Sequence, residues 1–135
     1  MQQSEEQFSE LMAHFIVRTN KMLQSGQKIP PLGLLLHENG SVQVSLIVYD
    51  DIEQIPDLIQ NMLESYSQKV LEQDIVASCI AIPNDVDQEV TVLLENFENY
   101  CIKYHIPIDI LNQTLNMNEA VASDSDVYVF PILEG

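Results

Sequence analysis

The chain has 135 residues and is 46% hydrophobic, which excludes a disordered acidic tail, because such a tail lacks the apolar content needed to offset its chain entropy. It carries 21 Asp and Glu residues against 5 Lys and Arg, a formal net charge of −16. This charge argues against nucleic acid and anionic membranes as partners, since both would be repelled, and it favours basic proteins or cations.

The same composition sets the expected number of domains and the expected location. The length predicts a single domain over residues 1–135. Cys79 and Cys101 are too few for a disulfide framework, and Met1–Ser9 lacks the apolar stretch of a signal peptide, so we expect a cytoplasmic protein. The longest apolar runs, Leu32–Leu36 and Ile75–Ile82, are too short to cross a bilayer.

The segment Ser4–Gln24 has the periodicity of an amphipathic helix. Its apolar side chains recur every three or four residues: Phe8, Leu11, Met12, Phe15, Met22 and Leu23. Ser4 and Gln7 have the spacing of a capping box at the start. Gly26 and the pair Pro30–Pro31 predict that the helix ends before them.

A β-hairpin follows the first helix. The strands Leu32–Glu38 and Ser41–Tyr49 are joined by Asn39–Gly40, a pair that tolerates the positive φ angles of a type I′ turn. The second strand alternates, with one side formed by Val42, Val44, Leu46 and Val48 and the other by Gln43 and Ser45.

A second amphipathic helix is predicted over Gln54–Leu71. Pro56 fits in its first turn, where the missing N–H has no intrahelical partner to lose. Four carboxylates crowd the start of this helix, where its dipole favours anions: Asp50, Asp51, Glu53 and Asp57.

The second half of the chain reads as strands. We predict strands at Ile75–Ile82, Val90–Phe97 and Tyr100–Ile108, with a short terminal strand at Val127–Ile132. The polar stretch 109–126 gives no clear pattern.

The predicted order is therefore α-β-β-α-β-β-β, closed by one more β-strand, in an α+β fold. Because the helices have one apolar face each, and the alternating strands also have one apolar face each, we expect a two-layer sandwich with both helices packed on one face of a mostly antiparallel sheet. The opposite face would carry polar side chains and meet water or a partner: Gln43, Ser45, Thr91, Lys103 and His105.

This topology predicts an acidic rim at one end of the sheet. The second helix must carry the chain back along the sheet, so Ile75–Ile82 should run in the same direction as Ser41–Tyr49 and finish at the same end. A hairpin formed by the next two strands would return Asp109 to that end. The predicted rim comprises Asp50, Asp51, Glu53, Asp57, Asp85, Asp87, Glu89 and Asp109.

No sequence motif indicates catalysis, a cofactor or a metal site. The four glycines are isolated, which excludes phosphate loops and dinucleotide fingerprints. His105 lies roughly 13 Å along a strand from Cys101, too far for a thiolate–imidazole couple. The segment Asp85–Glu89 is similar to a calcium loop in its carboxylate spacing, but it lacks the required glycine and closing glutamate. We therefore expect no catalytic residue, no cofactor and no metal ligand set.

Several short motifs carry a resemblance to known proteins: Pro31-Leu32-Gly33, the Asn39-Gly40 turn, Leu94-Glu95-Asn96, Tyr104-His105-Ile106-Pro107 and Tyr128-Val129-Phe130-Pro131. Together they resemble a group of small uncharacterised bacterial α+β proteins with a helix, hairpin, helix and three-strand order. The chain departs from that pattern at Asn96–Asn99, where a charged pair and a glycine are more typical. The resemblance implies the fold and transfers no activity or site residue.

Three functions remain open from the sequence. The first is a non-enzymatic binding module, comparable to an immunity or inhibitor protein, that meets a basic partner protein through its carboxylates. The second is a self-associating structural or accessory domain, such as a homodimer, that pairs through an open sheet face or strand edge. The third is an enzyme that uses carboxylates or a metal ion, for which no nucleophile or base is evident.

Overall fold

The computed structural model describes residues 2–84 and 88–133 and confirms the α+β class and the order of elements. Over these residues the elements are α1 (Gln2–Gln24), β1 (Leu32–His37), β2 (Val42–Leu46), α2 (Ile55–Glu72), β3 (Ile75–Asn84), β4 (Glu89–Asn96), β5 (Cys101–Asp109), β6 (Thr114–Leu115) and β7 (Val121–Asp124). Short 3-10 turns, η1 (Ile52–Gln54) and η2 (Met117–Glu119), precede α2 and β7. Within the described ranges, neither helix combines the length and the apolar character needed to cross a bilayer.

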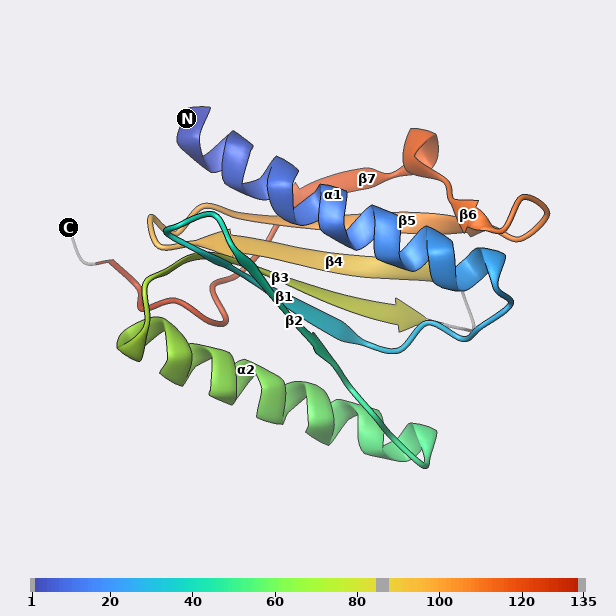
Figure 1. Cartoon of the computed structure of the whole chain (residues 1–135), viewed down its shortest axis with the longest axis horizontal. Coiled ribbons are helices and arrows are strands. Elements are labelled where there is room, and N and C mark those ends of the chain that lie inside the picture. Colours follow the sequence, from blue (N-terminus) through green and yellow to red (C-terminus); the bar gives the residue numbers. More distant parts are fainter. Residues whose placement is uncertain (1, 85–87, 134–135) are drawn as a thin grey trace.

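All strands form one antiparallel sheet (Figure 1). The strand order is β2-β1-β3-β4-β5, and both β6 and β7 pair with β5. Because β1 is antiparallel to both β2 and β3, its two neighbours β2 and β3 run in the same direction, as predicted. The ends of β2, β3 and β5 therefore lie at one end of the sheet, and β1 ends at the other.

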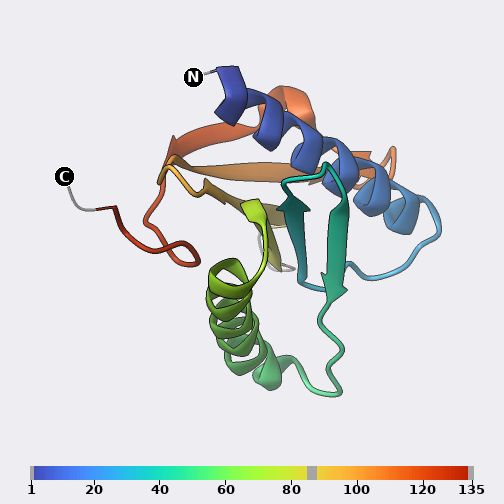
Figure 2. The same ribbon diagram turned by 60° about the vertical axis from the view of Figure 1, so that its left-hand side comes forward.

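The two helices cover opposite faces of the sheet, so the predicted two-layer sandwich with both helices on one face is wrong. One core cluster joins α1 residues such as Leu11 to Leu34 of β1 and Cys79 of β3. A second cluster joins Tyr66 of α2 to Leu35, the neighbour of Leu34. Figures 1 and 2 show α1 and α2 on either side of the strands.

The central strands explain this correction. Leu34, Leu35 and Leu36 are all buried, although successive side chains in a strand point to opposite faces. Cys79 and Ile80 in β3 are likewise both buried. Unbroken apolar runs of this kind are typical of strands covered on both sides, whereas alternation, which led to the two-layer prediction, belongs to β2 and β5 at the flanks.

Helix α2 approaches the sheet closely because β1 has a glycine beneath it. A Cβ atom at Gly33 would lie 2.7 Å from Tyr66 Cζ and 2.8 Å from Met62 Sδ, and closer still to the tyrosine oxygen. Tyr66 is 1% exposed, and burial raises the pKa of its phenol to about 12. Gly33 thus creates the space that the Tyr66 ring fills.

The predicted terminal strand at Val127–Ile132 is also wrong, because this segment is held by side chains instead of a β-ladder. Glu95 is 3% exposed, and its carboxylate accepts hydrogen bonds from Tyr128 N (2.9 Å), Val129 N (2.7 Å) and Phe130 N (2.9 Å). Val129 and Phe130 belong to the α2-side core. The last strand is instead β7, within the stretch 109–126 that gave no clear pattern.

Candidate functional site

Three residues of the predicted acidic rim, Asp50, Asp51 and Glu53, take part in a local hydrogen-bonded cap before α2. Asp51 Oδ1 accepts a hydrogen bond from Glu53 N (3.1 Å), and Gln54 Oε1 accepts from Asp50 N (3.0 Å) and Asp51 N (3.3 Å), a capping box at the start of η1. Asp57 follows in the first turn of α2.

The remaining rim residues lie at the ends of two strands or outside the described residues. Asp109, at the end of β5, accepts from Asn112 N (3.2 Å) and Asn112 Nδ2 (2.7 Å), and these bonds lower the pKa of its carboxyl. Glu89 begins β4, while Asp85 and Asp87 lie outside the described residues. In the part of the chain that is described, no three His, Cys, Asp or Glu side chains lie close enough together to hold a metal ion.

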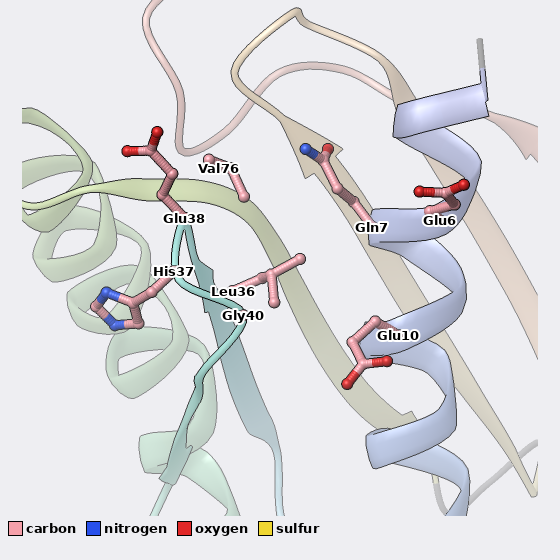
Figure 3. A pocket seen from close by; sticks show the side chains of 8 residues that line it. All are labelled: Glu6, Gln7, Glu10, Leu36, His37, Glu38, Gly40 and Val76. Atoms are coloured by element: carbon pink, nitrogen blue, oxygen red, sulfur yellow. The ribbon is translucent and has the colours of Figure 1, made fainter.

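An acidic cleft lies at the other end of the sheet, between α1 and the β1–β2 hairpin (Figure 3). It has a volume of about 340 Å³, and its lining residues are Glu6, Gln7, Glu10, Leu36, His37, Glu38, Gly40 and Val76. Gln7 and Glu10 reach from α1 toward the hairpin, while His37 points away from the helix. Three carboxylates thus surround an apolar floor formed by Leu36 and Val76.

The hairpin turn positions the cleft's far wall. Gly40 takes φ +91°, its N–H donates to His37 O (2.9 Å), and Asn39 Oδ1 accepts from Ser41 N (2.9 Å). The left-handed φ explains the glycine. The turn leaves Glu38 exposed beside the cleft.

A second hollow of about 500 Å³ continues the acidic cleft past the hairpin. It shares His37 and Glu38 with the cleft and adds Asn39, Gln73 and Asp74. Glu38 N donates to Asp74 O (2.7 Å), which ties the hairpin to the start of β3. Glu6, Glu10, Glu38 and Asp74 therefore form one acidic surface, and neither Lys nor Arg is among the described residues that line its two hollows.

Sequence reasoning missed this cleft because it placed the carboxylates at the ends of β2, β3 and β5. The available signals were the i, i+4 pair Glu6 and Glu10 on one flank of the first helix, and Glu38 at the hairpin turn. What the sequence did not reveal is that the first half of α1 lies over the end where β1 finishes and β3 starts.

A second polar group lies on the sheet face away from α1, where Glu89, Thr91 and His105 meet across β4 and β5. His105 Nδ1 lies 3.2 Å from Thr91 Oγ1 and 3.6 Å from Glu89 Oε1. A catalytic triad needs the nucleophile and the carboxylate on opposite ring nitrogens, but here both contact Nδ1. The group does not have the geometry for nucleophilic catalysis.

Both cysteines are poor nucleophiles in the folded chain. Burial raises the pKa of the Cys79 thiol to about 12. Partial burial, followed by the negative charges of Glu95 and Asp126, raises the pKa of Cys101 to about 11. Since the thiolate is the reactive form, neither residue is activated.

Comparisons of the chain with protein-family models, curated proteins and solved structures found no match. The geometry of the acidic cleft is therefore the main indication of function.

Proposed function

We propose that this protein is a non-enzymatic binding module whose acidic cleft receives a basic segment of a partner protein, as immunity and inhibitor proteins do. The observation that carries the proposal is the acidic surface of Glu6, Glu10, Glu38 and Asp74, with neither Lys nor Arg among the described lining residues. The net charge of −16 adds a long-range attraction for a cationic partner.

The shape of the cleft supports this function. Carboxylates of one sign in a concavity with low-dielectric walls focus the field and raise the local concentration of cations. Leu36 and Val76 offer an apolar floor for the methylene stems of Lys or Arg, whose charged groups would then meet the glutamates at the mouth. Such complementarity mainly increases association rates and fixes orientation.

The proposal includes a cytosolic location. Cys79 and Cys101 are free thiols in the structure, and free thiols are typical of reducing compartments. Fractionation of the host cell would test this part separately.

The binding experiment compares two triple variants with the same change in charge. One neutralises the cleft with Glu6→Gln, Glu10→Gln and Glu38→Gln, and the other neutralises exposed sites elsewhere with Glu64→Gln, Glu98→Gln and Glu119→Gln. Affinity for a fluorescent oligolysine peptide is measured by anisotropy at low and moderate salt. We expect the cleft variant to lose about tenfold in affinity, or about 1.4 kcal/mol, and the matched variant to lose much less.

Equal losses of affinity in the two triple variants would mean that peptide binding depends only on the net charge of the protein. No loss in the cleft variant would contradict the proposed site directly.

A further inference from the structure

Strand β2 is an edge strand without the features that usually protect an edge. It ends the strand order and, in the described part of the chain, pairs only with β1. Its sequence, Val42–Leu46, contains neither charge nor proline, and the pairing of these residues with β1 shows no bulge. The opposite edge is divided between the short strands β6 and β7, with η2 between them, and β7 ends in Asp124.

Every second residue of β2 points its main-chain N–H and C=O groups toward this open edge. His37 N donates to Ser41 O (2.9 Å) and Ile47 N donates to Pro31 O (3.0 Å), so the odd-numbered residues bond to β1. In an antiparallel pair the intervening residues point their N–H and C=O groups the other way. Val42, Val44 and Leu46 therefore present theirs outward.

We propose that two copies of this chain associate through β2, in an antiparallel pair with a two-fold axis at Val44. In this register Val44 meets Val44 of the second copy, and Val42 meets Leu46 of the second copy. Each copy offers three N–H and three C=O groups at Val42, Val44 and Leu46, and all of them find partners.

The side chains of β2 are complementary to themselves in this register. Val42 and Val44 pack on the α1-side core, so the α1 face of the joint would pair apolar residues with apolar residues. On the other face Gln43 would meet Ser45 of the second copy, a polar pair. Leu46 is 47% exposed in one chain, and pairing would cover it.

Charge also favours a second copy of this strand as the occupant. Residues 41–49 carry no charge in a protein of net charge −16, so pairing of the two β2 strands brings no carboxylates of these residues together. The antiparallel arrangement places the two hairpin turns, with their acidic clefts, at opposite ends of the paired strands. Pairing through a five-residue edge buries less surface than the roughly 800 Å² per partner of stable complexes. We therefore expect a dimer that forms only at high concentration and that salt favours, because salt screens the repulsion between the two acidic chains.

Analytical ultracentrifugation of the full chain tests the proposal, at concentrations up to about 1 mM and in about 1 M NaCl, where the Debye length is about 3 Å. We expect a mass that rises with concentration toward twice 15.3 kDa. Val44→Pro removes an outward N–H that β1 does not use, and we expect it to remain monomeric with an unchanged circular dichroism spectrum. A wild type that stays monomeric, or a folded Val44→Pro that dimerises equally well, would overturn the proposal.

Cross-linking tests the register even if Val44→Pro fails to fold. At the two-fold axis the Cα atoms of residue 44 would lie about 5.5 Å apart, within the range of a disulfide. Residue 45 and its symmetry mate would lie beyond about 7 Å. Under mild oxidation we expect covalent dimers from Val44→Cys and none above background from Ser45→Cys, and equal cross-linking of both would contradict the register. Neither test uses the acidic cleft, so the two proposals stand or fall separately.

Discussion

The two faces of the sheet are sealed by different means. On the α1 face, apolar side chains from six strands meet one helix, and a buried polar cluster at one end links Asn96 Nδ2 to Ser4 Oγ (2.8 Å) and Gln7 Oε1 (3.2 Å). On the α2 face the covering is composite: a helix placed close by Gly33, and a terminal segment fixed by the buried carboxylate of Glu95. The first arrangement depends mainly on apolar area, which tolerates substitutions that conserve volume, and the second depends more on individual atoms.

Among single substitutions, we expect the largest loss of unfolding free energy from replacing Glu95, on the α2 face. Replacing it with Ala leaves the N–H groups of Val129 and Phe130 without acceptors in a buried setting, which we expect to cost about 3 kcal/mol of unfolding free energy. Chemical denaturation measures this loss. The control Glu98→Ala, in the exposed turn nearby, should stay within about 0.5 kcal/mol of wild type.

Hydrogen exchange distinguishes loss of the terminal segment from global destabilisation. In Glu95→Ala, the amides of residues 128–130 should lose protection before those of β3. Unchanged protection there would show that the carboxylate does not hold the segment.

Gly33→Ala should have the next largest effect. The added methyl overlaps Tyr66 and Met62, and overpacking of this kind costs about 1–3 kcal/mol. Tyr66→Phe removes the closest atom, so in a double-mutant cycle we expect the double variant to recover part of the loss. Strict additivity would mean that the tyrosine oxygen is not the contact that limits this site.

The smallest expected effect on the free energy of unfolding at neutral pH comes from the two thiols, one on each face of the sheet. Because folding raises the pKa of Cys79 and Cys101 from 9.0 to about 12 and about 11, the folded chain holds these protons more tightly than the unfolded chain. Their contribution to stability is complete below about pH 9 and is lost as pH rises through the folded values. The free energy of unfolding should therefore fall above pH 9.

Thiol labelling measures the same property more directly. At pH 8 a pKa of about 11 instead of 9.0 leaves roughly 100-fold less thiolate, and the greater nucleophilicity of the more basic thiolate offsets about tenfold of this, so Cys101 should react about tenfold more slowly in the native than in the denatured protein. Native labelling at the denatured rate would contradict the raised pKa.

The sequence predicted the elements that local chemistry decides. The Asn39–Gly40 turn, the position of Pro56 in the first turn of α2 and the apolar periodicity of both helices placed these features within a few residues of where they lie. The direction of β3 relative to β2 followed from the connecting helix, which carries the chain back along the sheet. Each of these features depends on residues near one another in the chain.

The errors arose where distant segments meet. The apolar runs at Leu34–Leu36 and Cys79–Ile80 belong to strands buried on both faces, but we predicted one polar face, and only the assembled sheet shows which helix covers which face. Glu95 and Tyr128–Phe130 are far apart in sequence, so their contact could not be read from either motif. The acidic cleft was missed for the same reason, since its walls come from α1, the hairpin and β3.

The central functional claim is that basic segments bind at the hairpin end of the sheet. The most direct test is a ¹⁵N–¹H NMR titration of the full chain with an oligolysine peptide. We expect chemical-shift changes concentrated at residues 6–10, 37–40 and 73–76. Changes concentrated instead at residues 50–57 and 109, or spread evenly over all exposed carboxylates, would contradict it.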